Sequence, residues 1–244
     1  MAERGDKVWQ DSQIAKSYLR GRREAIPCAQ EQIDVMLRLI AASETPIERF
    51  LDLGCGDGIL SAAILERHPE ARGVLIDFSK AMLDAALQNL ADYSAVRYVN
   101  FDYAQPEWVD AVAGDAPFDA VVSGYSIHHQ PDERKRELYK EIFDLLVPGG
   151  VFVNVEHVSP SSKLGESLFE SRFIDSIHAL EREQGDARSR EQIALEFLNS
   201  EERKANILSP VEDQCQWLCE IGYDDVDCFL RVYELAVFAG RKPL

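Results

Sequence analysis

The chain has 244 residues, of which 46% are hydrophobic and 9% aromatic, a composition typical of one globular unit with an apolar core. Its 26 basic and 43 acidic residues give a net charge of −17, which disfavours tRNA and other polyanions because phosphate binding needs a basic surface. The five cysteines are scattered, no apolar stretch reaches the ~20 residues of a membrane span and the N-terminus is too polar for a signal peptide, so we expect a cytoplasmic protein outside the membrane.

The first part of the chain is predicted to be helical. Apolar residues recur there at the spacing of one helix face, namely Ile33, Met36, Leu37 and Ile40. Pro46 ends this segment. We expect residues 1–46 to form a helical lid over the rest of the chain.

Short apolar segments then alternate with helical ones from residue 47 to residue 160. The predicted strands are ERFLDLG, GVLIDFS, VRYVNFD, FDAVVSGYS and GVFVNVEHV. Helix-like segments such as SAAILERH and KAMLDAALQNL lie between them. Repeated alternation of strands and helices predicts a parallel sheet with helices on both faces.

The pattern changes in residues 161–208, which are helix-like without a strand. We interpret this segment as a cap of two or three helices inserted into one core, made of residues 47–160 and 209–244. The core closes with a helix and the segments VDCFLRVYE and LAVFAGRK, which are close enough to pair as an antiparallel hairpin. An exposed face of the cap could pair two chains into a homodimer.

The turn in LDLGCGDG lies between a predicted strand and a predicted helix. It lacks the last glycine of the dinucleotide fingerprint, where Ile59 stands, and it also lacks the Walker pattern, so it matches neither phosphate motif. Asp52 lies two residues before the first glycine. A carboxylate there disfavours an anion and suits an ammonium group.

Two more aspartates follow at equal intervals of one strand and one helix, Asp77 at the end of GVLID and Asp102 after VRYVNF. Because the carboxyl ends of parallel strands meet at one edge of the sheet, these residues should lie together where open α/β folds bind ligands. Asp77 suits two vicinal ribose hydroxyls, and Asp102 suits an adenine amine. The predicted ligand is a zwitterionic nucleoside without phosphates, S-adenosylmethionine.

Several motifs then carry a family resemblance. FLDLGCGDG, LIDFS and YVNFDY resemble the first three motifs of class I S-adenosylmethionine-dependent methyltransferases, and VPGG and FLRVYELAVFAGRK resemble the family's turn into strand five and its closing hairpin. The resemblance implies an α/β fold with a seven-stranded Rossmann-like sheet, mostly parallel with the last strand antiparallel. It also implies methyl transfer from S-adenosylmethionine to a small-molecule acceptor.

GRREAIPC and GESLFE also resemble the bacterial branch related to carboxy-S-adenosylmethionine synthase, which serves tRNA wobble-uridine modification. That branch has Gly-Tyr where this chain has Cys28 and Ala29, and it has a serine where this chain has Gly56. Arg203 is the nearest candidate for the arginine that holds the extra carboxylate in that branch. These departures favour ordinary methyl transfer over carboxymethyl chemistry.

The cofactor-binding residues are expected around the strand ends. They are Asp52, Gly54, Cys55 and Gly56 in the turn, Asp77, Phe78 and Met82 after the second strand, Asp102 and Tyr103 after the third, Ser123 and Tyr125 at the fourth, and Tyr18 in the N-terminal helices. The two turn glycines at positions 54 and 56 let the backbone approach the methionine part of the cofactor. Met82 fits a helix core equally well, and Tyr18 either closes over the cofactor or packs between helices.

Four candidate bases follow the fourth and fifth predicted strands: His128, His129, Glu156 and His157. A histidine titrates near neutrality and can accept a proton from an oxygen or nitrogen nucleophile. A base is optional, because the sulfonium already activates the methyl group and positioning supplies most of the rate. One residue of the histidine pair is alternatively a loop-fixing residue.

Three cysteines, Cys215, Cys219 and Cys228, lie in the last helix and hairpin, near Trp217 and Leu218. Cysteine sets bind arsenic or zinc in some proteins, but this spacing is typical of core residues. We expect buried, inert thiols and no metal site.

Three functions remain open from the sequence. The first is a methyltransferase acting on a small molecule enclosed by the cap, and the second is a carboxy-S-adenosylmethionine synthase-like or tRNA-modification enzyme. The third is a non-catalytic partner protein that binds S-adenosylmethionine. The polar residues predicted at the rim favour an enzyme.

Overall fold

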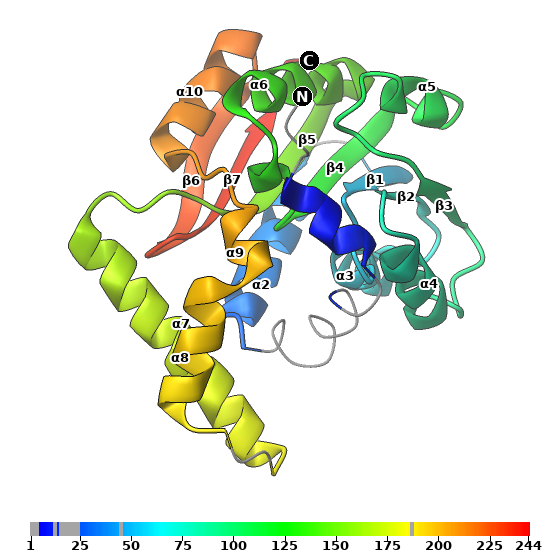
Figure 1. The fold of residues 1–244 in the computed structure, drawn as a ribbon. Helices are drawn as coiled ribbons and strands as arrows, with labels where there is room; N and C mark the ends of the chain where they lie inside the picture. The colour runs from blue at the N-terminus through cyan, green and yellow to red at the C-terminus, as the bar shows by residue number, and fades with distance from the viewer. Residues whose placement is uncertain (1–4, 12–13, 15–24, 44–45, 186–187) are drawn as a thin grey trace.

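The computed structural model describes residues 5–11, 14, 25–43, 46–185 and 188–244. Seven strands form one sheet in the order β3-β2-β1-β4-β5-β7-β6 (Figure 1). The strands are β1 (Arg49–Leu53), β2 (Arg72–Asp77), β3 (Val96–Asn100), β4 (Phe118–Gly124), β5 (Leu146–His157), β6 (Asp224–Val232) and β7 (Leu235–Arg241). The first five strands pair in parallel and β7 is antiparallel to β5 and β6, which confirms the predicted sheet.

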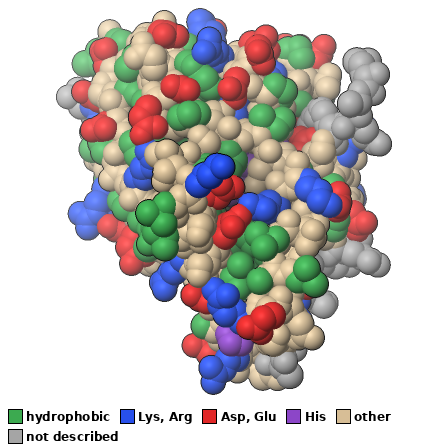
Figure 2. All heavy atoms as spheres, turned by 60° about the vertical axis from the view of Figure 1, so that its left-hand side comes forward, with side chains coloured by type: hydrophobic (Ala, Val, Ile, Leu, Met, Phe, Trp, Pro, Cys, Tyr) green, Lys and Arg blue, Asp and Glu red, His purple; other side chains and the backbone are tan. Residues whose placement is uncertain are grey.

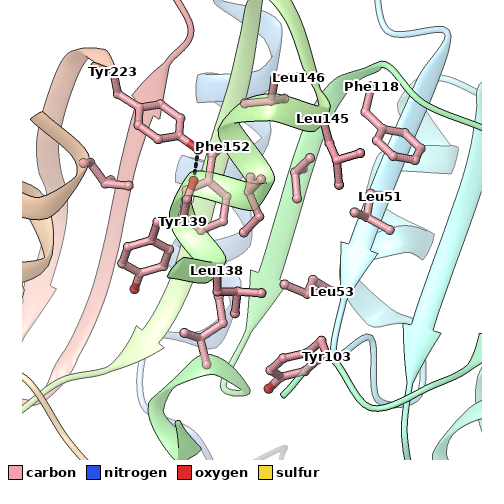
Figure 3. Packing of buried hydrophobic residues seen from close by; sticks show 14 of the residues in the cluster. Leu51, Leu53, Tyr103, Phe118, Leu138, Tyr139, Leu145, Leu146, Phe152 and Tyr223 are labelled. Carbon is pink, nitrogen blue, oxygen red and sulfur yellow. Dashed lines mark hydrogen bonds between the residues drawn. The ribbon is translucent and has the colours of Figure 1, made fainter. Parts of the chain in front are cut away.

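Helices cover both faces of this sheet because alternate strand residues point to opposite sides. The helices on one face are α2 (Ala29–Ala41), α3 (Ile59–Arg67) and α4 (Lys80–Asn89), and those on the other are α5 (Trp108–Val112), α6 (Asp132–Leu145) and α10 (Val211–Ile221). Phe50 packs on the first face, whereas Leu51 and Leu53 pack on the second. Figure 3 shows the second core, in which Tyr139 of α6 lies near Phe152 of β5.

The described part of the segment between β5 and α10 contains helices joined by loops and no strand. It contains α7 (Lys163–Glu183), α8 (Arg190–Asn199) and α9 (Glu201–Lys204), and α7 and α8 extend away from the sheet (Figure 1). Ser162, Ser189 and Ser200 cap the N-termini of these helices through their side-chain oxygens. Leucines are exposed on α7 and α8, and pairing of two chains through this face stays a prediction.

The expectation that all three C-terminal cysteines are buried is wrong. Cys219 is exposed, and Cys215 and Cys228 are only partly buried. The physical reason is the orientation of α10, whose inward face is occupied by Trp217 and Leu218.

None of the described helices is long and apolar enough to cross a membrane.

Candidate functional site

A cavity of about 690 Å³ lies at the carboxyl ends of the parallel strands and extends to the helices after β5. This volume is within the ~300–1,000 Å³ of typical ligand pockets. We call the part at the strand ends the donor half; it is lined by Asp52, Gly54, Cys55, Gly56, Asp77, Phe78, Met82, Asp102, Tyr103 and Tyr125. We call the part below the helices the acceptor half; it is lined by His157, Glu166, Phe169, Glu170, Phe173, Phe197, Arg203, Lys204, Asn206 and Glu234.

The glycine turn is held against β2 by its backbone. The N–H groups of Gly54 and Cys55 both donate to the carbonyl of Ile76, at 2.8 and 3.1 Å. Gly54 has a φ of 68° and a Cβ there would lie 1.8 Å from Ser126 Oγ, so the protein itself requires glycine. At Gly56, where φ is 54°, a Cβ would meet nothing within 4 Å. The turn therefore presents open space to the cavity at Gly56.

Asp77 ends β2 and has an exposed fraction of only 6%. Its Oδ2 accepts from the N–H of Gly56 at 3.0 Å, and its Oδ1 accepts from the N–H of Ser79 at 2.8 Å. Burial raises the pKa of Asp77 from 3.8 to about 6, although these hydrogen bonds favour the carboxylate. The side chain is a fixed acceptor at the wall of the cavity.

This pKa predicts that cofactor affinity depends on pH. The sequence predicts that Asp77 accepts from the ribose hydroxyls of S-adenosylmethionine. The ionised side chain is the better acceptor, so the affinity should rise as the pH rises through about 6 and then level off. The stability of the cofactor-free protein should fall over the same pH range. The pKa of Asp77 in the folded protein is above its ordinary value of 3.8, so the protonated side chain stabilises the folded state, and this stabilisation is lost as the pH rises through about 6. Calorimetric titrations on both sides of this pH test the prediction, with Asp77→Asn as the variant that removes the step. Affinity that is constant or falls with rising pH contradicts it.

The other two aspartates of the predicted set also line the cavity. Asp52 is almost fully buried, and its Oδ2 accepts from Ser61 Oγ at 2.6 Å. Asp102 follows β3 and accepts from the N–H of Ala104 at 3.0 Å. The structure thus brings Asp52, Asp77 and Asp102 to one edge of the sheet, as their spacing predicts.

Two predicted site residues lie behind the described wall of the cavity, and one lies outside the described residues. Ser123 is fully buried, and its hydroxyl donates to the carbonyl of Leu53 at 2.7 Å. Glu156 is also fully buried. Tyr18 belongs to the part of the chain that the structure does not describe.

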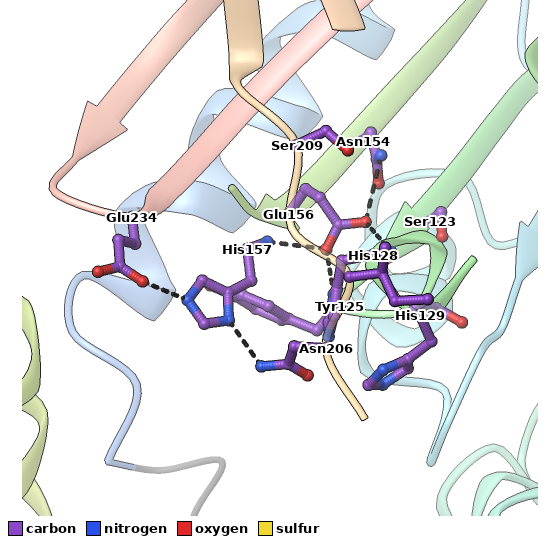
Figure 4. A network of polar contacts seen from close by, with 12 residues as sticks. Ser123, Tyr125, His128, His129, Asn154, Glu156, His157, Asn206, Ser209 and Glu234 are labelled. Atoms are coloured by element: carbon purple, nitrogen blue, oxygen red, sulfur yellow. Dashed lines mark hydrogen bonds and ion pairs between the residues drawn. The ribbon is translucent and has the colours of Figure 1, made fainter. Parts of the chain in front are cut away.

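The first predicted base, His128, is bound to Glu156. Its Nδ1 lies 2.5 Å from Glu156 Oε1, and its backbone N–H donates to Glu156 Oε2 at 3.1 Å (Figure 4). Burial raises the pKa of Glu156 to about 7 and lowers that of His128 well below its usual value. This pair fixes the loop after β4.

His129 forms a hydrogen bond with the N-terminal helix η1 (Gly5–Gln10). Trp9 Nε1 donates to His129 Nε2 at 3.0 Å, so Nδ1 carries the proton and donates to the carbonyl of Ala205 at 3.3 Å. Burial lowers the pKa of His129 to about 3. Both ring nitrogens of the neutral His129 are therefore engaged, by Trp9 and by the carbonyl of Ala205.

His157, at the end of β5, has a different environment. Its Nε2 lies 2.8 Å from Glu234 Oε2, and its Nδ1 lies 3.5 Å from Asn206 Nδ2 (Figure 4). A buried carboxylate beside Nε2 favours the tautomer that carries its proton there, which leaves the Nδ1 lone pair available. Sequence reasoning missed Glu234; a charged residue in the turn before the buried strand β7 is the signal that could have found it.

Comparisons with known proteins show similarity to methyltransferases. The methyltransferase domain family matches residues 51–152, which contain the glycine turn and Asp77. An uncharacterized methyltransferase of Mycobacterium tuberculosis is 35% identical over 115 residues, which cover 47% of this chain and 53% of that protein. This chain therefore matches only about half the length of that relative.

Two further similarities cover the chain more fully. A carboxy-S-adenosyl-L-methionine synthase of Nitratiruptor sp. is 21% identical over 235 residues, 95% of this chain and 92% of that protein. The structure of an O-methyltransferase family protein from Burkholderia thailandensis matches with a TM-score of 0.67 at 15% identity, over 100% of this chain and 64% of that chain. The latter shows the shared fold.

Residues 51–152 thus match a methyltransferase domain, and the chain shares the fold of a solved O-methyltransferase family structure. These matches support the class I S-adenosylmethionine-dependent methyltransferases as the family, although the matched domain covers less than half of the chain. They also support S-adenosylmethionine as the cofactor, as the sequence predicts.

Proposed function

We propose that this chain transfers the methyl group of S-adenosylmethionine to a small-molecule acceptor enclosed in the acceptor half. One observation carries the proposal: a single cavity joins Asp77 and the open Gly56 turn to the His157–Glu234 pair. A donor site and a candidate base thus share one chamber.

The residues of the donor half fit the cofactor. The carboxylate of Asp77 can accept from both ribose hydroxyls, and Asp102 can accept from the adenine amine. Phe78 and Met82 supply an apolar wall for the adenine ring, and the open space at Gly56 admits the amino-acid part. When bound, S-adenosylmethionine supplies a methyl group that its sulfonium makes electrophilic.

His157 is the proposed general base. Glu234 holds the Nε2–H, so Nδ1 can take the proton of an acceptor as the nucleophile forms its bond to the methyl carbon. The contact of Nδ1 with Asn206 is long at 3.5 Å, and a hydroxyl or amine of the acceptor can replace it. The aromatic rings of the acceptor half give this site an apolar wall, which disfavours water beside a bound acceptor.

A second candidate is carboxy-S-adenosylmethionine synthesis, which the similarity over 95% of the chain favours. That reaction needs a cation for the extra carboxylate. Arg203, the candidate, is paired with Glu170 and lies 3.7 Å from Glu166. This pairing supports ordinary methyl transfer instead.

A tRNA substrate has little support. The face in Figure 2 carries basic and acidic side chains interspersed rather than a continuous basic surface. The net charge of −17 adds long-range repulsion of a polyanion.

We place the reaction in a reducing cytoplasm, because the cysteines are scattered rather than paired in a disulfide framework.

A turnover screen tests the proposed function. The purified chain is incubated with S-adenosylmethionine and pooled metabolites of different classes, with tRNA included, and S-adenosylhomocysteine is quantified. We expect acceptor-dependent S-adenosylhomocysteine from a small-molecule pool and none from tRNA. Production from tRNA alone, or a carboxymethylated sulfonium retained by the purified protein, contradicts the proposal.

A further inference from the structure

The acceptor half has an aromatic wall that favours a flat or apolar body. The rings of Phe169 and Phe173 are stacked with centroids 5.9 Å apart, and those of Phe173 and Phe197 lie 5.2 Å apart. The ring of His157 lies 5.3 Å from Phe169, so the candidate base borders this wall. Faces of aromatic rings also attract cations.

Acidic residues outnumber basic ones in the lining of this half, which contains Glu166, Glu170, Glu234, Arg203 and Lys204. Arg203 is paired with Glu170, and Lys204 is paired with Glu201, so each of these two cations has a carboxylate partner. Glu234 lines the same space. An anionic acceptor would meet carboxylates here and cations that are already neutralised.

Glu234 adds an independent observation. It is only 5% exposed, and one carboxylate oxygen, Oε2, is bound to His157. The other oxygen, Oε1, is buried without a hydrogen-bond partner among the residues that the structure describes. Buried carboxylate oxygens are normally satisfied by donors, so this oxygen offers an acceptor position to a ligand.

Arg203 shows that this environment accommodates a cation. Its guanidinium lies over the ring of Phe197, 5.8 Å from the centroid, and pairs with Glu170. A cation between a phenyl face and a carboxylate is the same combination that Phe169 and Glu234 offer near His157. The chain thus contains one internal example of the contact that a ligand would make.

We propose that the methyl acceptor is a small organic amine, which enters as an ammonium cation with an apolar body; this inference rests on the proposed methyl transfer. The ammonium donates to Glu234 Oε1 while the body packs on Phe169 and Phe173. One N–H proton passes to His157 Nδ1, and the freed lone pair forms the N–C bond as the C–S bond breaks. The electron pair of that bond stays on sulfur, so the products are the N-methylated amine and neutral S-adenosylhomocysteine, and His157 returns its proton to water.

Binding of three probes of similar body and different charge tests the proposal. The protein is saturated with S-adenosylhomocysteine and titrated calorimetrically with 2-phenylethylamine, 2-phenylethanol or 3-phenylpropanoate at neutral pH. We expect the amine to bind about 10-fold more tightly than the alcohol and the carboxylate to bind most weakly, because a paired, desolvated charge discriminates by sign. Equal affinities, a reversed order or no binding of the amine overturns the inference.

Two variants assign the preference to a residue. Glu234→Gln should lower amine affinity about 10-fold and leave alcohol affinity and S-adenosylhomocysteine affinity unchanged. Glu183→Gln, which changes an exposed carboxylate of the same cap, should alter none of the three. An amine preference that survives Glu234→Gln overturns the role of Glu234. If S-adenosylhomocysteine and S-adenosylmethionine themselves fail to bind the wild-type protein, the proposed function fails, whereas binding of both without amine preference overturns this inference alone.

Discussion

Replacing Asp77 by alanine is expected to lower the affinity for S-adenosylmethionine by at least about 100-fold. The change removes the acceptor of two ribose hydroxyls, and a hydrogen bond to a charged group contributes about 1.5–3 kcal/mol. It also frees the N–H groups of Gly56 and Ser79, which Asp77 holds at 3.0 and 2.8 Å, so the turn loses its order at the place where the cofactor enters. Calorimetry with purified protein measures the effect.

The matched control is Asp84→Ala. Asp84 is an exposed aspartate on α4, and it pairs with Lys80 rather than lining the cavity. This variant should bind S-adenosylmethionine like the wild-type protein. If Asp77→Ala and Asp84→Ala have the same affinity, the donor half is wrongly assigned.

The second large effect is expected on turnover. His157→Ala should lower kcat by about 10²–10⁴-fold, the usual contribution of a positioned general base. Its effect on the dissociation constant of S-adenosylmethionine should be small, because the ring lies in the acceptor half beside Phe169 and Glu234. Steady-state kinetics and calorimetry on the same preparation separate the two quantities.

His178→Ala is the matched control, because this histidine lies on α7 but does not line the described cavity. It should retain wild-type turnover. Equal turnover of wild type and His157→Ala would mean that proximity alone drives the reaction. A loss of cofactor binding in His157→Ala would instead place the ring in the donor half.

The sheet and the donor half could be predicted because local sequence specifies them. The alternation of strands and helices fixes the parallel order, and a parallel sheet brings the residues that follow its strands to one edge. Asp52, Asp77 and Asp102 therefore line the same cavity in the structure, as their intervals predict. The turn glycines were predictable for the same reason, since positive φ at Gly54 and Gly56 is a local property.

The acceptor half could not be predicted because contacts between distant segments create it. Glu234 reaches His157 only because β7 pairs antiparallel with β5. The pairing of Arg203 with Glu170 likewise depends on how α9 meets α7. Neither contact leaves a periodic pattern in the chain.

Hydrogen bonds between distant segments also distinguish the four candidate bases from one another. Their positions in the sequence alone give no reason to prefer one of them. Glu156 is fully buried against His128. His129 is held between Trp9 and Ala205. His157 lines the cavity, its Nε2 is bound to Glu234, and its Nδ1 has one long contact, at 3.5 Å from Asn206. These contacts favour His157 as the proposed base.

The most direct test of the central claim, that the cavity joins a methyl donor to a small acceptor, is mass spectrometry of a reaction with S-adenosylmethionine deuterated in its methyl group. We expect an amine that carries the intact labelled methyl group, with an equal amount of S-adenosylhomocysteine, and a strong reduction of both in His157→Ala. Two results would contradict it. One is S-adenosylmethionine that binds but never yields S-adenosylhomocysteine with any acceptor; the other is a carboxymethyl sulfonium that has lost part of the label.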